Sequence, residues 1–452
     1  MKPRFQATGV STHPGKAYPI LVPMKILIIS PNFPPLNSIA SLRPYSWARC
    51  WTSLGHNVTI LTTQKPPSPQ ALTCDLSAFT MLEQPIPGYN LFRRLDDRSA
   101  GPKTARVARE RGLKKLTHAL NRLRRARGIF IGARMPDHHD LWILPAIRMV
   151  RKQKWDLLVS SHGPYASHLV ALHLKKNRPK TPWVADFRDL WTQNHIFPGV
   201  FPFTQLERYL EAHIARNADV LTTVSAPLAQ KLRKQYARKA FAIENGVDLA
   251  QLDALPSASV FPQDGLLRIV YTGTIYQGKQ DPSPLFQALA QLEQEGFPYA
   301  QRFRVIFAGK NLGPVLETAR SFGIERAVEV AGFVTHDHSL MMQRDADAVL
   351  FLEFEAPGYD GILTGKLFEY LASGTPIFSV GTQPSSSAGA LIEEAEAGEV
   401  CGRDLSRIKS VLVSLVEGDR IASRGRELVR QRYDRNLLAK RVLEVALSES
   451  SQ

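Results

Sequence analysis

Residues 364–377 read Thr-Gly-Lys-Leu-Phe-Glu-Tyr-Leu-Ala-Ser-Gly-Thr-Pro-Ile, the most informative stretch of this chain. Its two small leading residues open a predicted helix that carries Lys366 and Glu369 on one face and stops at Gly374. Free backbone N–H groups at a helix start attract phosphate, and Lys366 would add a point charge beside them. Glu369, one turn later, can accept hydrogen bonds from the two hydroxyls of a ribose. The stretch therefore predicts a site for a nucleotide diphosphate.

At 452 residues, the chain is longer than one hydrophobic core normally holds, so two domains are expected. Its 44% hydrophobic and 22% charged residues are typical of a soluble globular protein. Three widely spaced cysteines, of which one must stay unpaired, favour a reducing cytosol. No apolar run reaches the roughly 18 residues that a membrane span needs. Residues 1–23 lack the features of a signal peptide, so we expect a disordered N-terminal extension, with Met24 as an alternative start.

Short apolar segments alternate with helical ones along the chain, which predicts parallel sheets in an α/β protein. The linker is expected between residues 252 and 264, where prolines and small residues cluster, and a second alternating series starts at 267–272. We therefore predict two doubly wound, Rossmann-like domains, at 24–255 and 262–430, and a final helical segment at 431–452.

The formal net charge of +16 is concentrated in one segment. Residues 93–134 hold 14 Lys and Arg against three acids, a net charge of +11. Leucines at 113–123 recur every three or four residues among the basic side chains, as in helices that lie on a membrane surface. Nucleic acid and acidic lipid are both possible anionic partners, but no basic motif with interleaved aromatic residues occurs. We expect an anionic membrane surface and no nucleic acid, with a solvated charged helix as the alternative.

Five blocks of the sequence, taken in order, resemble glycosyltransferase family 4. They are Met24–Pro35, Ala185–Trp191, Glu244–Asp248, Tyr271–Thr274 and Thr364–Ile377. The resemblance implies the GT-B fold, in which two Rossmann-like domains face each other across a cleft and a C-terminal helix crosses back to the N-terminal domain. It also implies a retaining enzyme, of the glycosyl transferases group 1 type, that uses a nucleotide sugar.

Candidate residues of the first domain follow predicted strands, where open parallel sheets bind their ligands. The resemblance implies that His162 approaches the transferred sugar and hydrogen-bonds one of its hydroxyls; a turn histidine satisfied by backbone is the alternative. We expect Asp189 to face the cleft and orient the acceptor or the donor sugar. Asp186 and Arg188 are expected to be structural, for example as a local ion pair. His168 is expected to be a capping or packing residue.

The second domain is expected to bind the nucleotide. The resemblance implies that Lys279, in the loop after the domain's first strand, grips the diphosphate. We expect Lys366, one helical turn before Glu369, to compensate for the arginine that relatives carry beside this lysine. The resemblance also implies that the loops after the next two strands enclose the base. The predicted catalytic residues are His162, Asp189, Lys279 and Lys366. The predicted nucleotide-contacting residues are Gly273, Thr274, Gly309, Ile362, Leu363, Thr364, Gly365 and Glu369.

The sequence also departs from the family pattern. A Gly-Gly pair that many relatives carry after the first strand is replaced by residues 37–41, and Arg43, at the end of the expected loop, is either a site residue or a surface charge. Thr274 stands where many relatives have an arginine. Gly361 replaces the first of two glutamates that relatives carry eight residues apart, and the adjacent Asp360 could substitute for it.

No metal ion or other cofactor is expected. His138-His139-Asp140 and His336-Asp337-His338 are tempting clusters, but adjacent residues seldom converge on one ion, and we expect both to lie in loops. The resemblance implies that helix ends and Lys or Arg neutralise the departing diphosphate instead.

These observations predict a retaining, hexosyltransferase-like glycosyltransferase. It would move a sugar from a nucleotide-diphosphate sugar to a glycan or lipid-linked acceptor in cell-surface polysaccharide biosynthesis. It would act in the cytoplasm or at the inner face of the cytoplasmic membrane. A nucleotide-sugar 2-epimerase and a catalytically inactive GT-B scaffold are the alternatives. A dehydrogenase is disfavoured, because no Gly-x-Gly-x-x-Gly follows the first strand.

Overall fold

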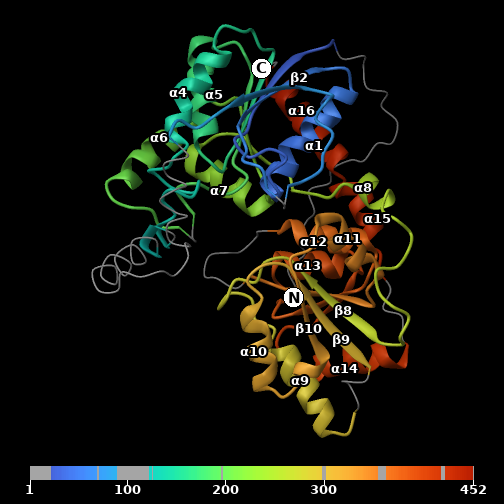
Figure 1. Ribbon diagram of the computed structural model, residues 1–452. Coiled ribbons are helices and arrows are strands. Elements are labelled where there is room, and N and C mark those ends of the chain that lie inside the picture. The colour runs from blue at the N-terminus through green and yellow to red at the C-terminus, as the bar shows by residue number, and fades with distance from the viewer. Residues whose placement is uncertain are drawn as a thin grey trace, which may run out of the picture.

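The computed structural model shows two lobes, each built on one parallel β-sheet (Figure 1). The expected N-terminal extension, up to residue 21, and most of the basic segment fall outside the residues that the structure describes. In the described part of the chain, no helix is long and apolar enough to cross a membrane. The described residues are 22–68, 71–88, 122–124, 126–194, 197–297, 302–354, 363–418 and 423–450.

The N-terminal sheet has seven parallel strands in the order β3-β2-β1-β4-β5-β6-β7. Its strands are β1 (Lys25–Ile29), β2 (Asn57–Thr63), β3 (Thr80–Gln84), β4 (Leu157–Ser161), β5 (Trp183–Asp186), β6 (Val220–Thr223) and β7 (Ala240–Ala242). Its helices are α1 (Ile39–Ser53), α4 (Asp140–Val150), α5 (Ala166–Asn177), α6 (Phe203–Asn217), α7 (Ala226–Tyr236) and α8 (Leu249–Asp253). Helices α4 to α7 cover one face of the sheet, and α1 covers the other. Burial on both faces explains why the central strands read as continuous apolar runs.

The C-terminal sheet has six parallel strands in the order β10-β9-β8-β11-β12-β13. Its strands are β8 (Leu267–Thr272), β9 (Phe303–Ala308), β10 (Val328–Gly332), β11 (Ala348–Leu352), β12 (Ile377–Val380) and β13 (Gly398–Val400). Its helices are α9 (Ser283–Gln294), α10 (Gly313–Ser321), α11 (His336–Asp345), α12 (Gly365–Ser373), α13 (Ser387–Glu394), α14 (Leu405–Glu417) and α15 (Gly425–Leu428). Helices α9, α10 and α14 pack on one face, and α11, α12, α13 and α15 pack on the other.

In each sheet, the strands that follow the first strand in sequence are added first on one side of it and then on the other. Strand β1 lies between β2 and β4, and β8 lies between β9 and β11. Ligands of open parallel sheets bind beyond the carboxyl ends of the strands at such a switch point. The structure has the predicted GT-B architecture, and its two switch points are the places to look for a site.

The C-terminal helix α16 (Arg435–Ser450) crosses back to the N-terminal lobe, as expected. It lies beside α1 in Figure 1, where the red end of the chain meets the blue one. The indole of Trp51 donates a hydrogen bond to the carbonyl oxygen of Ala439 (2.9 Å), and Leu438 and Val442 complete the apolar core under α1.

Helix α1 starts earlier than predicted. The expected loop ran through Arg43, but α1 begins at Ile39 because the Ser38 side chain accepts a hydrogen bond from the Ser41 amide. Pro44 lies inside this helix. Strands β3 and β13 and helix α4 were not predicted. The linker expected at 252–264 begins in the last residues of α8 and continues through irregular chain before β8.

Candidate functional site

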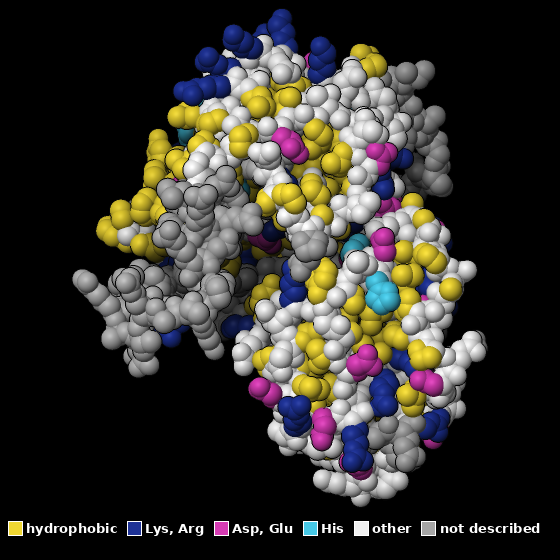
Figure 2. Space-filling view, viewed as in Figure 1, with side chains coloured by type: hydrophobic (Ala, Val, Ile, Leu, Met, Phe, Trp, Pro, Cys, Tyr) yellow, Lys and Arg dark blue, Asp and Glu magenta, His cyan; other side chains and the backbone are white. Residues whose placement is uncertain are grey.

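A cavity of about 490 Å³ lies between the two lobes. One wall follows β1, β4 and β5 of the N-terminal sheet, and the other is formed by Tyr276 and the start of α12. Figure 2 shows the two lobes meeting at a narrow waist. Both walls therefore belong to the carboxyl edges at which parallel sheets hold ligands.

The start of α12 has the predicted form. The helix runs from Gly365 to Ser373, with Thr364 as its N-cap and Gly374 in the left-handed conformation (φ 77°) at its C-cap. The hydroxyl of Thr364 makes no cap hydrogen bond and is buried without a partner among the described residues. A Cβ at Gly365 would lie 2.9 Å from Cδ1 of Ile39, so the N-terminal lobe touches this helix end. The first backbone N–H groups of a helix have no partner within it, and here they face the cavity wall.

Lys366 lies across the end of β8. Its Nζ donates a hydrogen bond to Oη of Tyr271 (2.6 Å) and sits 3.8 Å from the centre of that ring. The Tyr271 hydroxyl donates in turn to the carbonyl oxygen of Thr274 (2.9 Å). Burial lowers the pKa of Lys366 to about 7, although the negative charge of Glu369 acts to raise it. An ammonium that is desolvated to this degree gains most from an anionic ligand.

Two predicted glycines allow this close packing. A Cβ at Gly273 (φ 118°) would lie 2.9 Å from Cε of Lys366, and one at Gly309 (φ 147°) would lie 1.9 Å from the carbonyl oxygen of Gly273. Only glycine adopts such conformations without strain. The structure thus brings Gly273, Thr274, Gly309 and Lys366 together near α12.

Glu369 is held by two side chains of α11. Nε2 of His336 lies 3.1 Å from Oε1 of Glu369, and the amide of Gln343 donates to Oε2 at 3.5 Å. Burial acts to raise the pKa of Glu369, but His336 outweighs it, so the carboxyl pKa lies below its usual range. Burial acts to lower the pKa of His336, but its hydrogen bond with Glu369 raises it above the ordinary value. A carboxylate has about four acceptor positions, so ribose hydroxyls can still bind beside these partners.

His162, on the opposite wall, is the most unusual side chain of the site. It is 4% exposed, and neither ring nitrogen has a hydrogen-bond partner among the described residues. Its backbone N–H donates to the carbonyl oxygen of Asp186 (2.8 Å), which fixes the residue at the end of β4. Burial lowers the pKa of His162 to about 4, so the imidazole is neutral at pH 7. Buried polar atoms without partners are rare, and here they line the cavity.

The charges after β5 pair differently from the expected Arg188–Asp186 contact. Asp186 is fully buried and forms a bidentate ion pair with Arg43 (2.8 and 3.1 Å). Arg43, 2% exposed, is therefore neither a surface charge nor a cavity residue. Arg188 pairs instead with Asp189 (2.6 Å), and both line the cavity. Burial acts to raise the pKa of Asp189, but the Arg188 guanidinium holds it below its usual range.

His168 is a packing residue in the core of the N-terminal lobe, as expected. It is fully buried beside Phe187, and its Nδ1 lies 2.7 Å from Oγ of Ser160.

Lys279 is not brought to this site. It is exposed in a turn in which its amide donates to the carbonyl oxygen of Tyr276 (2.9 Å), and it lines a separate cavity of about 250 Å³ with Asp281 and Arg403. Leu363 lines the interdomain cavity, whereas Ile362 lies outside the described residues, as do Asp360 and Gly361.

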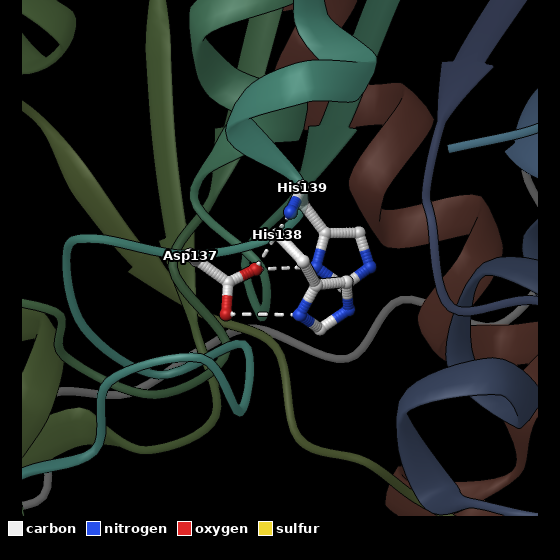
Figure 3. Close-up of side chains that lie close together, drawn as sticks. All are labelled: Asp137, His138 and His139. Atoms are coloured by element: carbon white, nitrogen blue, oxygen red, sulfur yellow. Dashed lines mark hydrogen bonds and ion pairs between the residues drawn. The ribbon is translucent and has the colours of Figure 1, made fainter. Parts of the chain in front are cut away.

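The two histidine clusters also differ from expectation. His336 to His338 form the first turn of α11, capped by Thr335, and not a loop. In the other cluster, Asp137 rather than Asp140 joins His138 and His139, and their ligand atoms all lie within 4.8 Å of one another (Figure 3). Asp140 instead begins α4 and accepts a hydrogen bond from the Tyr165 hydroxyl (2.5 Å).

Three residues of the site were missed. The partner of Lys366, Tyr271, lay in a quoted motif but looked like a core residue. His336 contacts Glu369 across 33 residues of sequence, which no local pattern reveals. Asn245 lines the cavity with a buried Oδ1 that has no partner among the described residues. Its place in the block Glu244–Asp248 was the available signal.

Comparisons with known proteins bear on the family and on the fold. Residues 44–251 match the sequence model described as Glycosyltransferase Family 4. A search of the curated proteins gave no match. Among solved structures, the sucrose-phosphate synthase of Thermosynechococcus elongatus has a TM-score of 0.60 at 14% identity, covering 94% of this chain and 98% of that one.

Two further structures are similar over nearly the whole chain. The lipopolysaccharide outer core galactosyltransferase WaaB, in its apo form, has a TM-score of 0.55 at 13% identity, covering 94% of this chain and 100% of that one. A putative UDP-N-acetylglucosamine 2-epimerase from Listeria monocytogenes has a TM-score of 0.51 at 11% identity, covering 93% and 95%. At such identities these similarities establish the fold alone.

Proposed function

We propose that this chain is a member of glycosyltransferase family 4, whose sequence model matches residues 44–251, and that it transfers a sugar with retention of configuration to a glycan or lipid-linked acceptor. The donor is a nucleotide sugar, as the family implies. We place the diphosphate at the start of α12, the transferred sugar beside His162, and the acceptor on the N-terminal wall.

One observation carries the proposal. His162 from the N-terminal lobe and Thr364 from the C-terminal lobe line the same cavity, and each has buried side-chain polar atoms without a partner among the described residues. A buried polar group costs free energy unless it is hydrogen-bonded. A ligand that spans the two lobes, with phosphate oxygens at one end and sugar hydroxyls at the other, would satisfy both.

The arrangement explains how the leaving group is stabilised. As the bond to the sugar breaks, charge grows on the diphosphate oxygens, where the N–H groups of α12, the Thr364 hydroxyl and the Lys366 ammonium would meet it. Glu369 would hold the ribose, and the neutral His162 would hydrogen-bond the sugar. Asp189, oriented by Arg188, would position a hydroxyl of the acceptor or of the donor sugar. Closure of the lobes would exclude water, which otherwise hydrolyses the donor.

The test is to incubate the full chain with uridine, adenosine and guanosine diphosphate sugars, with and without a membrane extract. Nucleotide release that depends on the extract, together with labelling of an acceptor, is the expected result. Isomerised sugar nucleotide without an acceptor would instead indicate an epimerase. If no donor gives nucleotide release or acceptor labelling, although nucleotides still bind, the protein would be an inactive scaffold.

Nucleotide binding should depend on pH through Lys366. Since its pKa is about 7, the ammonium that attracts a diphosphate is lost as the pH rises above that value. We expect the affinity for the best nucleoside diphosphate to fall by up to about tenfold per pH unit above neutrality. Calorimetric titrations between about pH 6 and about pH 8.5 measure this. The Lys366→Met variant should bind weakly with a flat profile, and an unchanged slope in that variant would refute the assignment.

We also propose peripheral docking on an anionic membrane through the basic segment 93–134. The support is its net charge of +11, since each Lys or Arg near an anionic surface contributes about 1 kcal/mol of attraction. In co-sedimentation, vesicles with phosphatidylglycerol should retain the protein, and vesicles of phosphatidylcholine alone should not. Moderate salt should release it. Equal retention on both kinds of vesicle would contradict the proposal.

A further inference from the structure

A second cavity, of about 620 Å³, lies in the N-terminal lobe next to the interdomain cavity. The two cavities share Asn32 and His139 as lining residues. The amide of Asn32 donates to the carbonyl oxygen of Gly163, so this side chain stands between them. The second cavity follows the carboxyl ends of β1, β2 and β3, on the wall that the acceptor would occupy. A group bound here would belong to the acceptor side of the reaction.

All titratable side chains that line this second cavity are basic. Among the described residues that line it, these are Lys65, His138 and His139, and none of those residues is an Asp or a Glu. Nζ of Lys65 donates to Oγ1 of Thr62 (2.8 Å) and to the carbonyl oxygen of Thr63, which are neutral oxygens. No carboxylate of the described residues lies within ion-pair distance of it. The direct partners of Lys65 are thus neutral. Burial lowers its pKa to about 7, and the charge of Glu83 acts to raise it.

Asp137 fixes the orientation of the neighbouring imidazole. Nδ1 of His139 lies 2.5 Å from Oδ1 of Asp137, which also accepts the His139 backbone N–H (3.0 Å). Oδ2 of Asp137 accepts the backbone N–H of Gly132 (2.7 Å). Because a carboxylate can only accept, the proton of His139 is on Nδ1, and its Nε2 is the nitrogen left for a ligand. Figure 3 shows both imidazoles directing a nitrogen at this one carboxylate.

We propose that this second cavity binds an anionic phosphate or diphosphate group of the acceptor, held by Lys65 and His139. Only the assignment of the bound group to the acceptor rests on the proposed function. The anion site itself is argued from the residues of the cavity alone. An ammonium without a counterion gains a charge-assisted hydrogen bond from phosphate oxygens. Asp137 would hold the His139 ring so that Nε2 is the nitrogen that meets the phosphate.

The same geometry argues against a metal ion at Asp137, His138 and His139. A metal ligand must offer a lone pair, but Nδ1 of His139 uses its position to donate a proton to Asp137. Both oxygens of Asp137 already accept backbone N–H groups, and Lys65 lines the same cavity as the two histidines. A phosphate can accept from Lys65, whereas a metal ion would have to displace the hydrogen bonds that Asp137 already makes.

Calorimetric titration with inorganic pyrophosphate tests the proposal. All proteins are titrated in a Lys366→Gln background, so that the α12 site does not contribute. We expect Lys65→Gln and His139→Gln each to weaken binding by about tenfold, as the loss of one charge-assisted contact should. Lys180→Gln, which removes an exposed lysine and the same charge, should bind as its parent does. Thermal melts confirm that each variant is folded.

Parallel titrations with glucose 1-phosphate and geranyl diphosphate distinguish a soluble acceptor from a lipid-linked one. Tighter binding of geranyl diphosphate, again sensitive to Lys65→Gln, supports a lipid diphosphate. Equal affinities of the Lys65→Gln and Lys180→Gln proteins for every phosphate would overturn the site. Preferential binding of Zn²⁺, lost in Asp137→Asn, would overturn it in favour of a metal centre. Phosphate binding without any sugar transfer would leave this site standing and refute the proposed function alone.

Discussion

The Lys366→Met variant is expected to lose about 100- to 1,000-fold in kcat/KM for the donor, the effect of removing one preorganised group from developing negative charge. The side chain lies across Gly273 with its Nζ on the Tyr271 hydroxyl, so its position is fixed before the donor binds. Methionine preserves most of the volume and the packing on the ring, so the loss reports the charge. Release of nucleotide product under steady-state conditions measures it.

Lys279→Met is the informative control for Lys366. The sequence analysis predicted that both lysines contact the diphosphate, but the structure places Lys279 on an exposed turn that lines another cavity. We expect its removal to change kcat/KM by less than about threefold, as for a surface substitution worth within about 0.5 kcal/mol. A loss in Lys279→Met as large as that in Lys366→Met would mean that the 276–279 turn joins the site when the donor binds.

The Arg43→Met substitution should destabilise the N-terminal lobe by about 3–5 kcal/mol, because it leaves the buried carboxylate of Asp186 without its cation. Among the described residues, Asp186 then retains as side-chain partners the hydroxyls of Ser161 and Thr222, which neutralise no charge. The measurement is urea unfolding followed by tryptophan fluorescence. All six tryptophans of the chain belong to the N-terminal lobe, so the signal reports that lobe.

Two controls isolate the buried charge. The double variant Arg43→Met with Asp186→Leu should recover much of the lost stability, since no unpaired charge remains. Asp189→Asn breaks the more exposed pair with Arg188 and should cost about 0–1 kcal/mol. A double variant less stable than Arg43→Met would show that the ion pair, and not the orphaned charge, dominates.

Much of the fold could be predicted because its signals are local. Helix α12 has a small-residue start and a glycine stop, and both were correct. The central strands carry apolar runs because helices cover both of their faces. Strands β3 and β13 escaped prediction because edge strands are short and only partly buried, so their sequences carry no clear alternation.

The site was harder to predict because its contacts join distant segments. The partner of Arg43 lies 143 residues away, and His336 reaches Glu369 across 33. Asp186 and Asp189 are similar residues three positions apart, yet one is buried in an ion pair and the other lines the cavity. The turn of the chain after β5 makes that difference, and no residue type encodes it alone.

The crossing of α16 has a consequence for how this protein is made. The indoles of Trp47 and Trp51 pack against Leu438, Val442 and Ala446, which are translated long after the two tryptophans. Until α16 has been translated, the apolar face of α1 in the N-terminal lobe stays uncovered. An exposed apolar surface of this kind binds chaperones and promotes aggregation during synthesis. Ribosome-bound chains that end before residue 435 should bind chaperones that recognise exposed apolar segments, and chains that include α16 should dissociate from these chaperones.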